Sequence, residues 1–182
     1  MFNKPRLLTP GPTPLPERVR LALAQDMIHH RKPGFKKILL ETETMLQKLF
    51  GTEQPVLPLS CSGTGAMTAA VHGLFLPGET VIVVNGGKFG ERWSKIAAVR
   101  GLKVVEIDVA WGQAVTPAQV EQALREHPEA KGVFMQVCET STAAQHPVEA
   151  IARLTRTREV LLVADGISAV GISPCPMGAW GI

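Results

Sequence analysis

The stretch best suited to bind a ligand is residues 60–70, which read SCSGTGAMTAA. The apolar residues 55–59 before it predict a short buried strand, and small residues at helical spacing follow it. A strand, a tight turn and a helix start can hold an anion, because the first helical N–H groups lack partners and the helix dipole is positive there. The turn offers amides, hydroxyl groups and glycines, from Ser62, Gly63, Thr64, Gly65 and Ala66.

Two common nucleotide-binding motifs do not fit this turn. The dinucleotide fingerprint needs a third glycine where Thr68 stands, and an acid after the next strand, where Asn85 stands. A P-loop needs a Gly-Lys-Ser/Thr sequence, which does not follow. A phosphate bound by backbone and hydroxyl groups, without metal or lysine, fits better. Glycine-rich turns also occur in strand–helix crossovers that bind nothing.

Composition narrows the class of protein. With 182 residues, 45% of them hydrophobic, the chain can bury one sizeable core. The net charge of +3 is spread without a Lys/Arg run, which argues against nucleic acid as a partner. No apolar run has the length of a membrane span, and the start lacks a signal-peptide pattern. Three widely spaced cysteines in no metal-ligand pattern suggest reduced thiols in a cytoplasmic protein.

The order of the predicted elements indicates an α/β fold. Residues 1–16 form a Pro/Gly-rich arm, and residues 17–182 form one domain that opens with helices at 17–27 and 35–50. Strands are then predicted at 80–84, 103–109, 131–137 and 159–164, and helices at 91–100, 116–126 and 148–157. Apolar strands that alternate with helices predict a mostly parallel sheet with helices on both faces, which binds ligands at the carboxyl ends of its strands.

Three further strand-end loops carry residues suited to a ring-shaped ligand. Phe89 lies between glycines, which would let its ring lie flat on a ligand, and Thr140 lies in a loop rich in hydroxyl groups. Asp165 ends the last strand, where an acid can cap a helix, bind a metal or pair with a buried cationic nitrogen. Residue type alone favours the helix cap; a metal would need companion carboxylates, whereas a protonated pyridine nitrogen needs only one.

A phosphate cradle, a stacking aromatic, a hydroxyl donor and a pyridinium partner are together what pyridoxal 5'-phosphate requires. At these residues the sequence resembles the class V aminotransferases. The resemblance is to the alanine–glyoxylate and serine–pyruvate group, which includes sequences labelled soluble hydrogenase small subunit. The resembling segments occur in family order and span the chain: TPGPTP from Thr9, His30-Arg31, SGTGAM from Ser62, NGGKFGERW from Asn85, Trp111-Gly112, ETST from Glu139 and the strand that ends in Asp165.

The resemblance implies the large domain of an aspartate aminotransferase-like, pyridoxal-phosphate-dependent transferase. It implies that Phe89 stacks on the pyridine ring, that Thr140 lies near the ring hydroxyl and that Asp165 pairs with the ring nitrogen. The cofactor phosphate would be held by Thr64, Gly65 and Ala66.

The resemblance also implies an activity. Such enzymes move an amino group between a small amino acid of the alanine or serine type and a small 2-oxo acid of the glyoxylate or pyruvate type. The arm around Gly11 would line the substrate entrance, and family members are usually homodimers with sites at the subunit interface.

The sequence departs from the family in two ways that matter. The family usually has glycine after Glu-x-Ser-Thr, where this chain has Ala143. The family's Schiff-base lysine follows a Trp-Gly-Ile/Leu-Asp stretch, and none of the nine lysines present has that context. We therefore expect the N-terminal part of such an enzyme, its large domain incomplete before the C-terminal domain, with no Schiff-base lysine and no activity alone.

Three alternatives remain open from the sequence. The chain could be a non-catalytic fragment or binding module of this fold. It could be a nucleotide-binding oxidoreductase, although the missing third glycine and acid argue against that class. It could also be a pyridoxal-phosphate lyase or desulfurase, since Cys138 and Cys175 offer thiols, although buried cysteines are usually inert.

Overall fold

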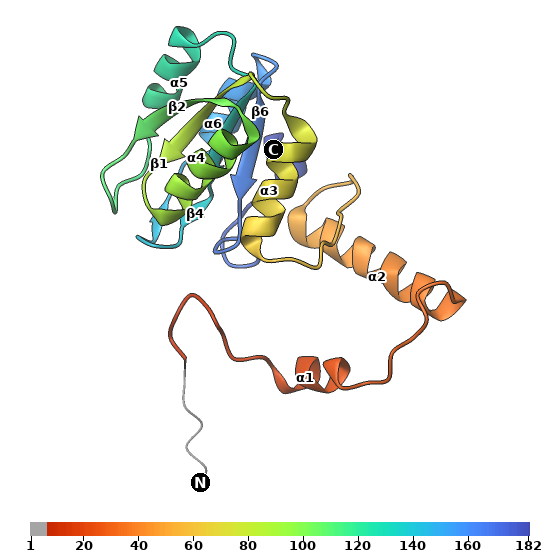
Figure 1. Cartoon of the computed structure of the whole chain (residues 1–182). Helices are drawn as coiled ribbons and strands as arrows, with labels where there is room; N and C mark the ends of the chain where they lie inside the picture. Colours follow the sequence, from red (N-terminus) through yellow and green to blue (C-terminus); the bar gives the residue numbers. More distant parts are fainter. Residues whose placement is uncertain (1–6) are drawn as a thin grey trace. The chain divides into compact units, whose positions relative to one another are not determined.

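A computed structural model describes residues 7–182 (Figure 1). The chain divides into two units, Met1–Met45 and Leu46–Ile182, and helix α2, Pro33–Phe50, crosses the division. In the first unit, residues 7–16 form no regular structure, and the rest of the predicted arm, residues 1–6, lies outside the described residues. Helix α1, Glu17–Leu23, is shorter than predicted and has no buried residue. Helix α2 begins two residues before its predicted start. The predicted boundary between residues 16 and 17 stays a prediction.

The second unit is an α/β domain built on a four-stranded sheet. Its strands are β1 (Thr80–Asn85), β2 (Lys103–Asp108), β3 (Gly132–Gln136) and β6 (Leu161–Asp165). They lie in the order β2-β1-β3-β6, and every neighbouring pair is parallel. The predicted α/β class with a parallel sheet is thus confirmed.

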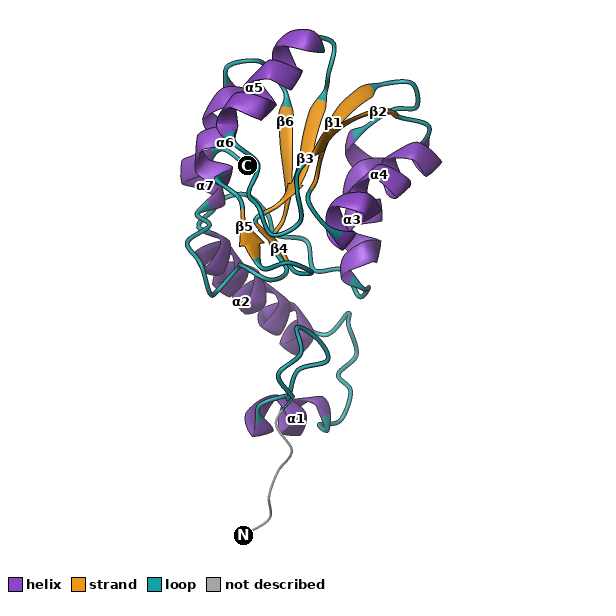
Figure 2. Cartoon of the chain, turned by 90° about the vertical axis from the view of Figure 1, so that its left-hand side faces the viewer, coloured by secondary structure: helices purple, strands orange, loops and turns teal. Residues whose placement is uncertain are grey.

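Helices cover both faces of this sheet (Figure 2). Helices α3 (Gly63–Leu74) and α4 (Lys88–Arg100) cover one face, and α5 (Pro117–Glu126) and α6 (Val148–Arg156) cover the other. Trp93 and Phe75 pack on Phe134 under α3 and α4, with ring centroids 5.1 and 5.0 Å apart. Alternate residues of the same strands, such as Ile82 and Met135, pack against α5 and α6. Burial on both faces explains why the two central strands, β1 and β3, are almost wholly apolar, whereas the edge strand β2 carries Lys103, Glu106 and Asp108.

The helix ends follow from local sequence. Thr116 caps α5 as predicted: its hydroxyl oxygen accepts from the Gln119 N–H, while the Gln119 side chain accepts from the Thr116 N–H. Helix α4 ends at Gly101, which has a φ of 84° that glycine adopts without strain.

The predicted strand at residues 55–59 is wrong. These residues form no regular structure and are mostly exposed, and in the part of the chain that the structure describes they pair with no strand. Pro55 and Pro58 have no N–H to donate, which weakens any ladder there. Two short elements were not predicted: a hairpin of β4 (Cys138–Glu139) and β5 (Ala144–Gln145), and helix α7 (Met177–Trp180).

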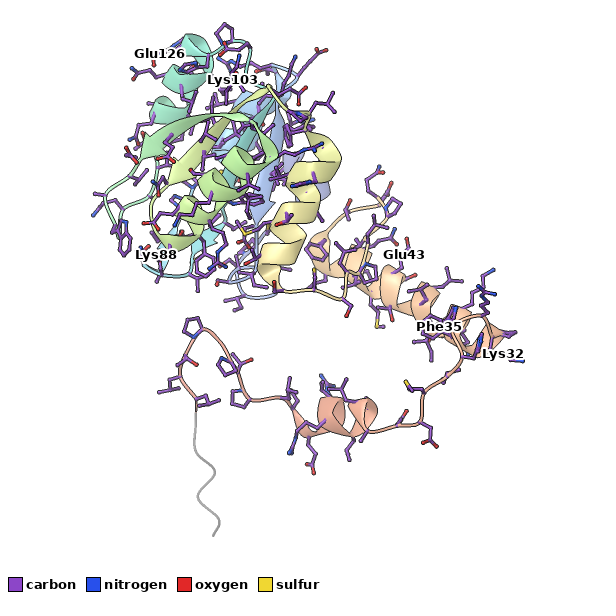
Figure 3. All side chains as sticks on the ribbon, viewed as in Figure 1. Lys32, Phe35, Glu43, Lys88, Lys103 and Glu126 are labelled. Atoms are coloured by element: carbon purple, nitrogen blue, oxygen red, sulfur yellow. The ribbon has the colours of Figure 1, made fainter. Side chains whose placement is uncertain are left out.

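The strands run in one direction, so their carboxyl ends share one edge of the sheet. Figure 3 shows Lys88, just after β1, at that edge, and Lys103, which begins β2, at the opposite edge. The turns after β1, β3 and β6 therefore lie near one another. Among the described residues, no helix is both long and apolar enough to cross a membrane.

Candidate functional site

A cavity of about 430 Å³ lies between the start of α3 and the end of β6. Its volume is in the range of small-molecule sites. The lining includes Gly63, Ala66 and Met67 from α3, and Asp165, Gly166 and Ile167 from the end of β6 and the turn after it. The first turn of α3 and Asp165 thus line one space.

The predicted anion cradle is the capped first turn of α3. The hydroxyl oxygen of Ser62 accepts from the Gly65 N–H at 3.2 Å, and the Ser62 carbonyl accepts from the Ala66 N–H at 3.1 Å. The amides of Gly65 and Ala66 therefore donate within the turn, while Gly63 and Thr64 open the helix, where amides have no intrahelical acceptor. A side chain at Gly65 would place its Cβ 2.8 Å from the Cys61 Cβ, so the turn requires glycine.

The Thr64 hydroxyl has a cationic partner that was not predicted. Arg92 of α4 donates to it from Nη1 at 2.8 Å, and the Arg92 guanidinium lies 4.6 Å from the centroid of the Phe89 ring. Arginine binds phosphate oxygens strongly and also stacks on aromatic faces. The expectation of a phosphate site without lysine or metal is compatible with this geometry, but the cradle includes a guanidinium.

Phe89 is held through its backbone by a buried carboxylate. The Glu139 side chain is 0% exposed and accepts from the Phe89 N–H at 3.2 Å and from the Gly90 N–H at 3.1 Å, both to Oε2. These amides belong to the first turn of α4, which lacks intrahelical acceptors. Glu139 therefore caps α4 from the end of strand β4, about 50 residues further along the chain.

Thr140 joins the loop after β3 to the loop after β6. Its hydroxyl group is hydrogen-bonded to the Ser168 hydroxyl group, three residues after Asp165. Glu139 and Ser141, on either side of Thr140, both contact residues 87–90, the N-cap and first turn of α4, which we call the Phe89 loop. The three loops thus form one connected set of contacts.

Asp165 lies partly buried at the end of β6. Burial raises the pKa of its carboxyl group, and the nearby Glu139 charge adds to the rise, whereas the Ile167 N–H and Arg92 oppose it. The Ile167 N–H donates to Asp165 Oδ1 at 3.0 Å and closes a turn, and no helix begins there. Among residues 7–182, no group of three metal-ligating side chains exists. A lone, partly desolvated carboxylate suits a cationic nitrogen, because a partner charge would offset its desolvation.

A family match decides what kind of site this is. Residues 10–182 match the family model for class V aminotransferases. The chain belongs to the class V aminotransferase family. A soluble hydrogenase small subunit from a Synechococcus strain is 35% identical over 185 residues, which cover all of this chain and 48% of that protein. A serine–glyoxylate aminotransferase from Hyphomicrobium methylovorum is 33% identical over 187 residues, which cover all of this chain and 46% of that protein.

Solved structures agree with the family match. An alanine–glyoxylate aminotransferase from Nostoc superposes with a TM-score of 0.94 at 30% identity, over all of this class V chain and 48% of the other. An aspartate aminotransferase of subgroup IV from Thermus thermophilus superposes with a TM-score of 0.90 at 36% identity, over 98% of this chain and 50% of the other. The chain thus spans about half the length of these relatives. Pyridoxal 5'-phosphate is the cofactor of this family.

The class V chain carries groups that fit this cofactor. The opening amides of α3 and the Arg92 guanidinium suit a phosphate, and the Asp165 carboxylate suits a pyridinium nitrogen. Gly11 lies in the first unit and is exposed. Its role at a substrate entrance stays a prediction.

Sequence reasoning missed three residues of this site: Arg92, Glu139 and Ser168. Each acts through a partner on a different element, 28 to 50 residues away. The signal for Arg92 was its place one turn after Phe89, which puts both side chains on one face of α4. No sequence signal indicates that Glu139 caps a distant helix.

Proposed function

We propose that this chain is the cofactor-binding part of an aminotransferase that moves an amino group between an alanine- or serine-type amino acid and a glyoxylate- or pyruvate-type 2-oxo acid. The observation that carries the proposal is the single cavity that the first turn of α3 and Asp165 both line. Similar proteins, which include a serine–glyoxylate and an alanine–glyoxylate aminotransferase, support the substrate class.

The proposed roles follow from the chemistry of each group. The amides of Gly63 and Thr64 bind the cofactor phosphate, with Arg92 supplying the positive charge. The Gly65 and Ala66 amides, which the sequence also suggested for the phosphate, already donate to Ser62. Phe89 packs on one face of the ring, and the Thr140 hydroxyl group lies near the ring hydroxyl. Asp165 holds a proton on the ring nitrogen as its carboxylate partner. When bound, pyridoxal phosphate supplies an electron sink for the substrate α-carbon.

The proposal extends to the longer protein. Since the chain spans about half the length of its relatives, we infer that it forms the N-terminal part of such an enzyme, with the cofactor-linked lysine elsewhere. A homodimer, a substrate entrance near Gly11 and a cytoplasmic location belong to this proposal. All three described cysteines are free, as the cytoplasmic assignment expects.

The test is an amino-transfer assay on the full-length protein that contains this chain. Alanine or serine is supplied with glyoxylate or pyruvate, and the product amino acid is measured. The Asp165→Ala variant should lose activity roughly a hundredfold or more, the scale of losing one electrostatic group in an active site. Asp108→Asn, an exposed acid at the end of β2, is the matched control and should retain activity. Unchanged turnover in Asp165→Ala would refute the assigned role.

Two alternatives are separated by simple measurements. A non-catalytic binding module would bind pyridoxal 5'-phosphate without forming an amino acid from any 2-oxo acid. A lyase or desulfurase would release ammonia or sulfide from serine or cysteine without a 2-oxo acid acceptor. Borohydride added to the cofactor-loaded protein traps a covalent adduct only where a lysine is linked to the cofactor.

A further inference from the structure

Glu139 is a buried carboxylate that receives hydrogen bonds from two site loops. It is 0% exposed, although glutamate is rarely buried without partners. From the Phe89 loop it accepts the N–H groups of Phe89 and Gly90. From its own loop it accepts the Ser141 N–H at 3.1 Å and the Ser141 hydroxyl at 2.6 Å.

Both oxygens of Glu139 are needed as acceptors. Oε1 takes the two groups of Ser141, and the shortest contacts to Oε2 come from Phe89 and Gly90. Every partner is a donor, and only a carboxylate has two oxygens that both accept. A glutamine would turn an NH₂ group toward one set of donors, and that set would lose its acceptor in a buried place.

The contact between the two loops leaves no spare room. A Cβ at Gly87 would lie 2.6 Å from the Glu139 Cδ and 2.5 Å from the Ser141 hydroxyl oxygen. The Lys88 N–H also donates to that hydroxyl oxygen at 3.0 Å. The backbone of the Phe89 loop therefore lies directly on the Glu139 side chain, and small shifts of one loop must move the other.

We propose that Glu139 is a positioning residue that fixes the Phe89 loop against the loop of Thr140. It thereby sets the spacing between the residue that packs on the ring face and the residue near the ring hydroxyl. The inference rests on the proposed function, because Phe89 and Thr140 are the residues proposed for the ring face and the ring hydroxyl. Thr140 lies between Glu139 and Ser141, which both bind the Phe89 loop, and its hydroxyl group contacts Ser168 near Asp165. Glu139 thus connects the stacking residue to the acid.

The test compares Glu139→Gln with two control variants in the whole chain. Glu149→Gln removes an exposed carboxylate of α6 that pairs with Arg153, so it matches the loss of charge. Thr116→Ala removes the α5 cap, so it lowers stability without touching the site. The probe is pyridoxamine 5'-phosphate, which has no aldehyde to react with surface lysines.

Two readouts are measured. Hydrogen exchange at the Phe89 and Gly90 amides should be at least about tenfold faster in Glu139→Gln, relative to the Val83 amide in β1, and unchanged in both controls. Binding of pyridoxamine 5'-phosphate should weaken about tenfold or more, and the circular dichroism band of its bound ring should change, because the ring loses its fixed neighbours. Thr116→Ala, which is merely destabilised, should keep the band of the unaltered chain.

A second variant covers the case in which Glu139→Gln does not fold. Ser141→Ala keeps the carboxylate and removes one donor to it, so it should produce the same changes at smaller size. If both variants match Glu149→Gln in amide exchange and in the dichroism band, the role assigned to Glu139 is wrong. Failure of the unaltered chain to bind pyridoxamine 5'-phosphate would instead refute the proposed function, since the exchange readout needs no cofactor.

Discussion

The Nη1 atom of Arg92, on α4, donates to the hydroxyl oxygen of Thr64, on the first turn of α3, at 2.8 Å. The same guanidinium lies over the Phe89 ring and opposes the burial-driven rise in the Asp165 pKa. One cation therefore acts on residues proposed for the phosphate, the ring face and the ring nitrogen. The site is organised around this arginine as much as around the glycine-rich turn.

Replacing Arg92 should weaken phosphate binding selectively. Arg92→Gln removes the charge but keeps donors, and hydrogen bonds to charged groups contribute about 1.5–3 kcal/mol, or roughly a 10- to 100-fold change in affinity. Titration calorimetry should show that loss for pyridoxamine 5'-phosphate and little change for pyridoxamine, which lacks the phosphate. Arg125→Gln, on α5, is the control. Equal losses for both ligands would mean that Arg92 does not face the phosphate.

The ionised Asp165 carboxylate should lower the free energy of unfolding at neutral pH. Burial, and to a smaller extent the Glu139 charge, raise the pKa of the Asp165 carboxyl group in the folded chain above the ordinary 3.8. At pH values just above 3.8, the folded state therefore binds more protons than the unfolded state. Stability therefore falls as the pH rises through that window. Asp165→Asn, which keeps an acceptor for the Ile167 N–H, should have a higher thermal midpoint at pH 7 and no advantage near pH 3.8. An advantage that persists unchanged at low pH would contradict the burial argument.

His146 should give the opposite pH dependence. Burial lowers its pKa, against an opposing effect of Glu139, and its Nδ1 accepts from the Val115 N–H at 3.1 Å, which requires a neutral ring. The pKa of His146 in the folded chain lies below the ordinary 6.5. The stabilising contribution of the neutral ring is therefore fully present above pH 6.5 and is lost as the pH falls from 6.5 through the folded pKa. Thermal midpoints from pH 7.5 to 5 should fall for the unaltered chain and less for His146→Gln. His72→Gln, an exposed control, should follow the unaltered chain.

Ala143 occupies a backbone conformation that favours glycine. Its φ is 58°, in the left-handed region, at the position where the family usually has glycine. Such a conformation costs an L-residue about 1–2 kcal/mol, and glycine avoids this cost. The gain is partly offset because glycine loses more conformational freedom on folding than alanine does. Ala143→Gly should therefore stabilise the chain by about 0.5–1 kcal/mol, measured by urea unfolding. Ala118→Gly, at an exposed position of α5, should destabilise it by a similar amount; a loss at both positions would contradict the argument.

The sheet could be predicted because its signals are local. Strands β1 and β3 are buried, mostly apolar runs, and Thr116 with Gln119 marks the start of α5. The strand predicted at residues 55–59 failed because an apolar run becomes a strand only beside a partner, and the residues described here provide none. Helix α4 begins at Lys88 rather than at the predicted residue 91, because Glu139 supplies acceptors to its first turn.

The candidate site could be predicted only in part for the same reason. Thr64, Phe89, Thr140 and Asp165 are each predicted from residue type and from a turn expected after a strand, although no strand precedes the Thr64 turn in the described residues, and their roles stay predictions. The groups that join them are long-range contacts: Arg92 reaches Thr64, Glu139 reaches Phe89, and Ser168 reaches Thr140. Only the folded chain brings these pairs together, since sequence spacing does not specify contacts between elements.

One phosphorylated pyridine ring should contact the α3 start, the Phe89 loop and the turn after β6 together. The most direct test is an amide NMR titration of the whole chain with pyridoxamine 5'-phosphate. We expect saturable shifts that are largest at Gly63, Thr64, Phe89 and Gly166. In the Asp165→Ala variant, the shift at Gly166 should be reduced more than the shift at Thr64. Shifts confined to α5 and α6, or no saturable shifts at all, would contradict this expectation.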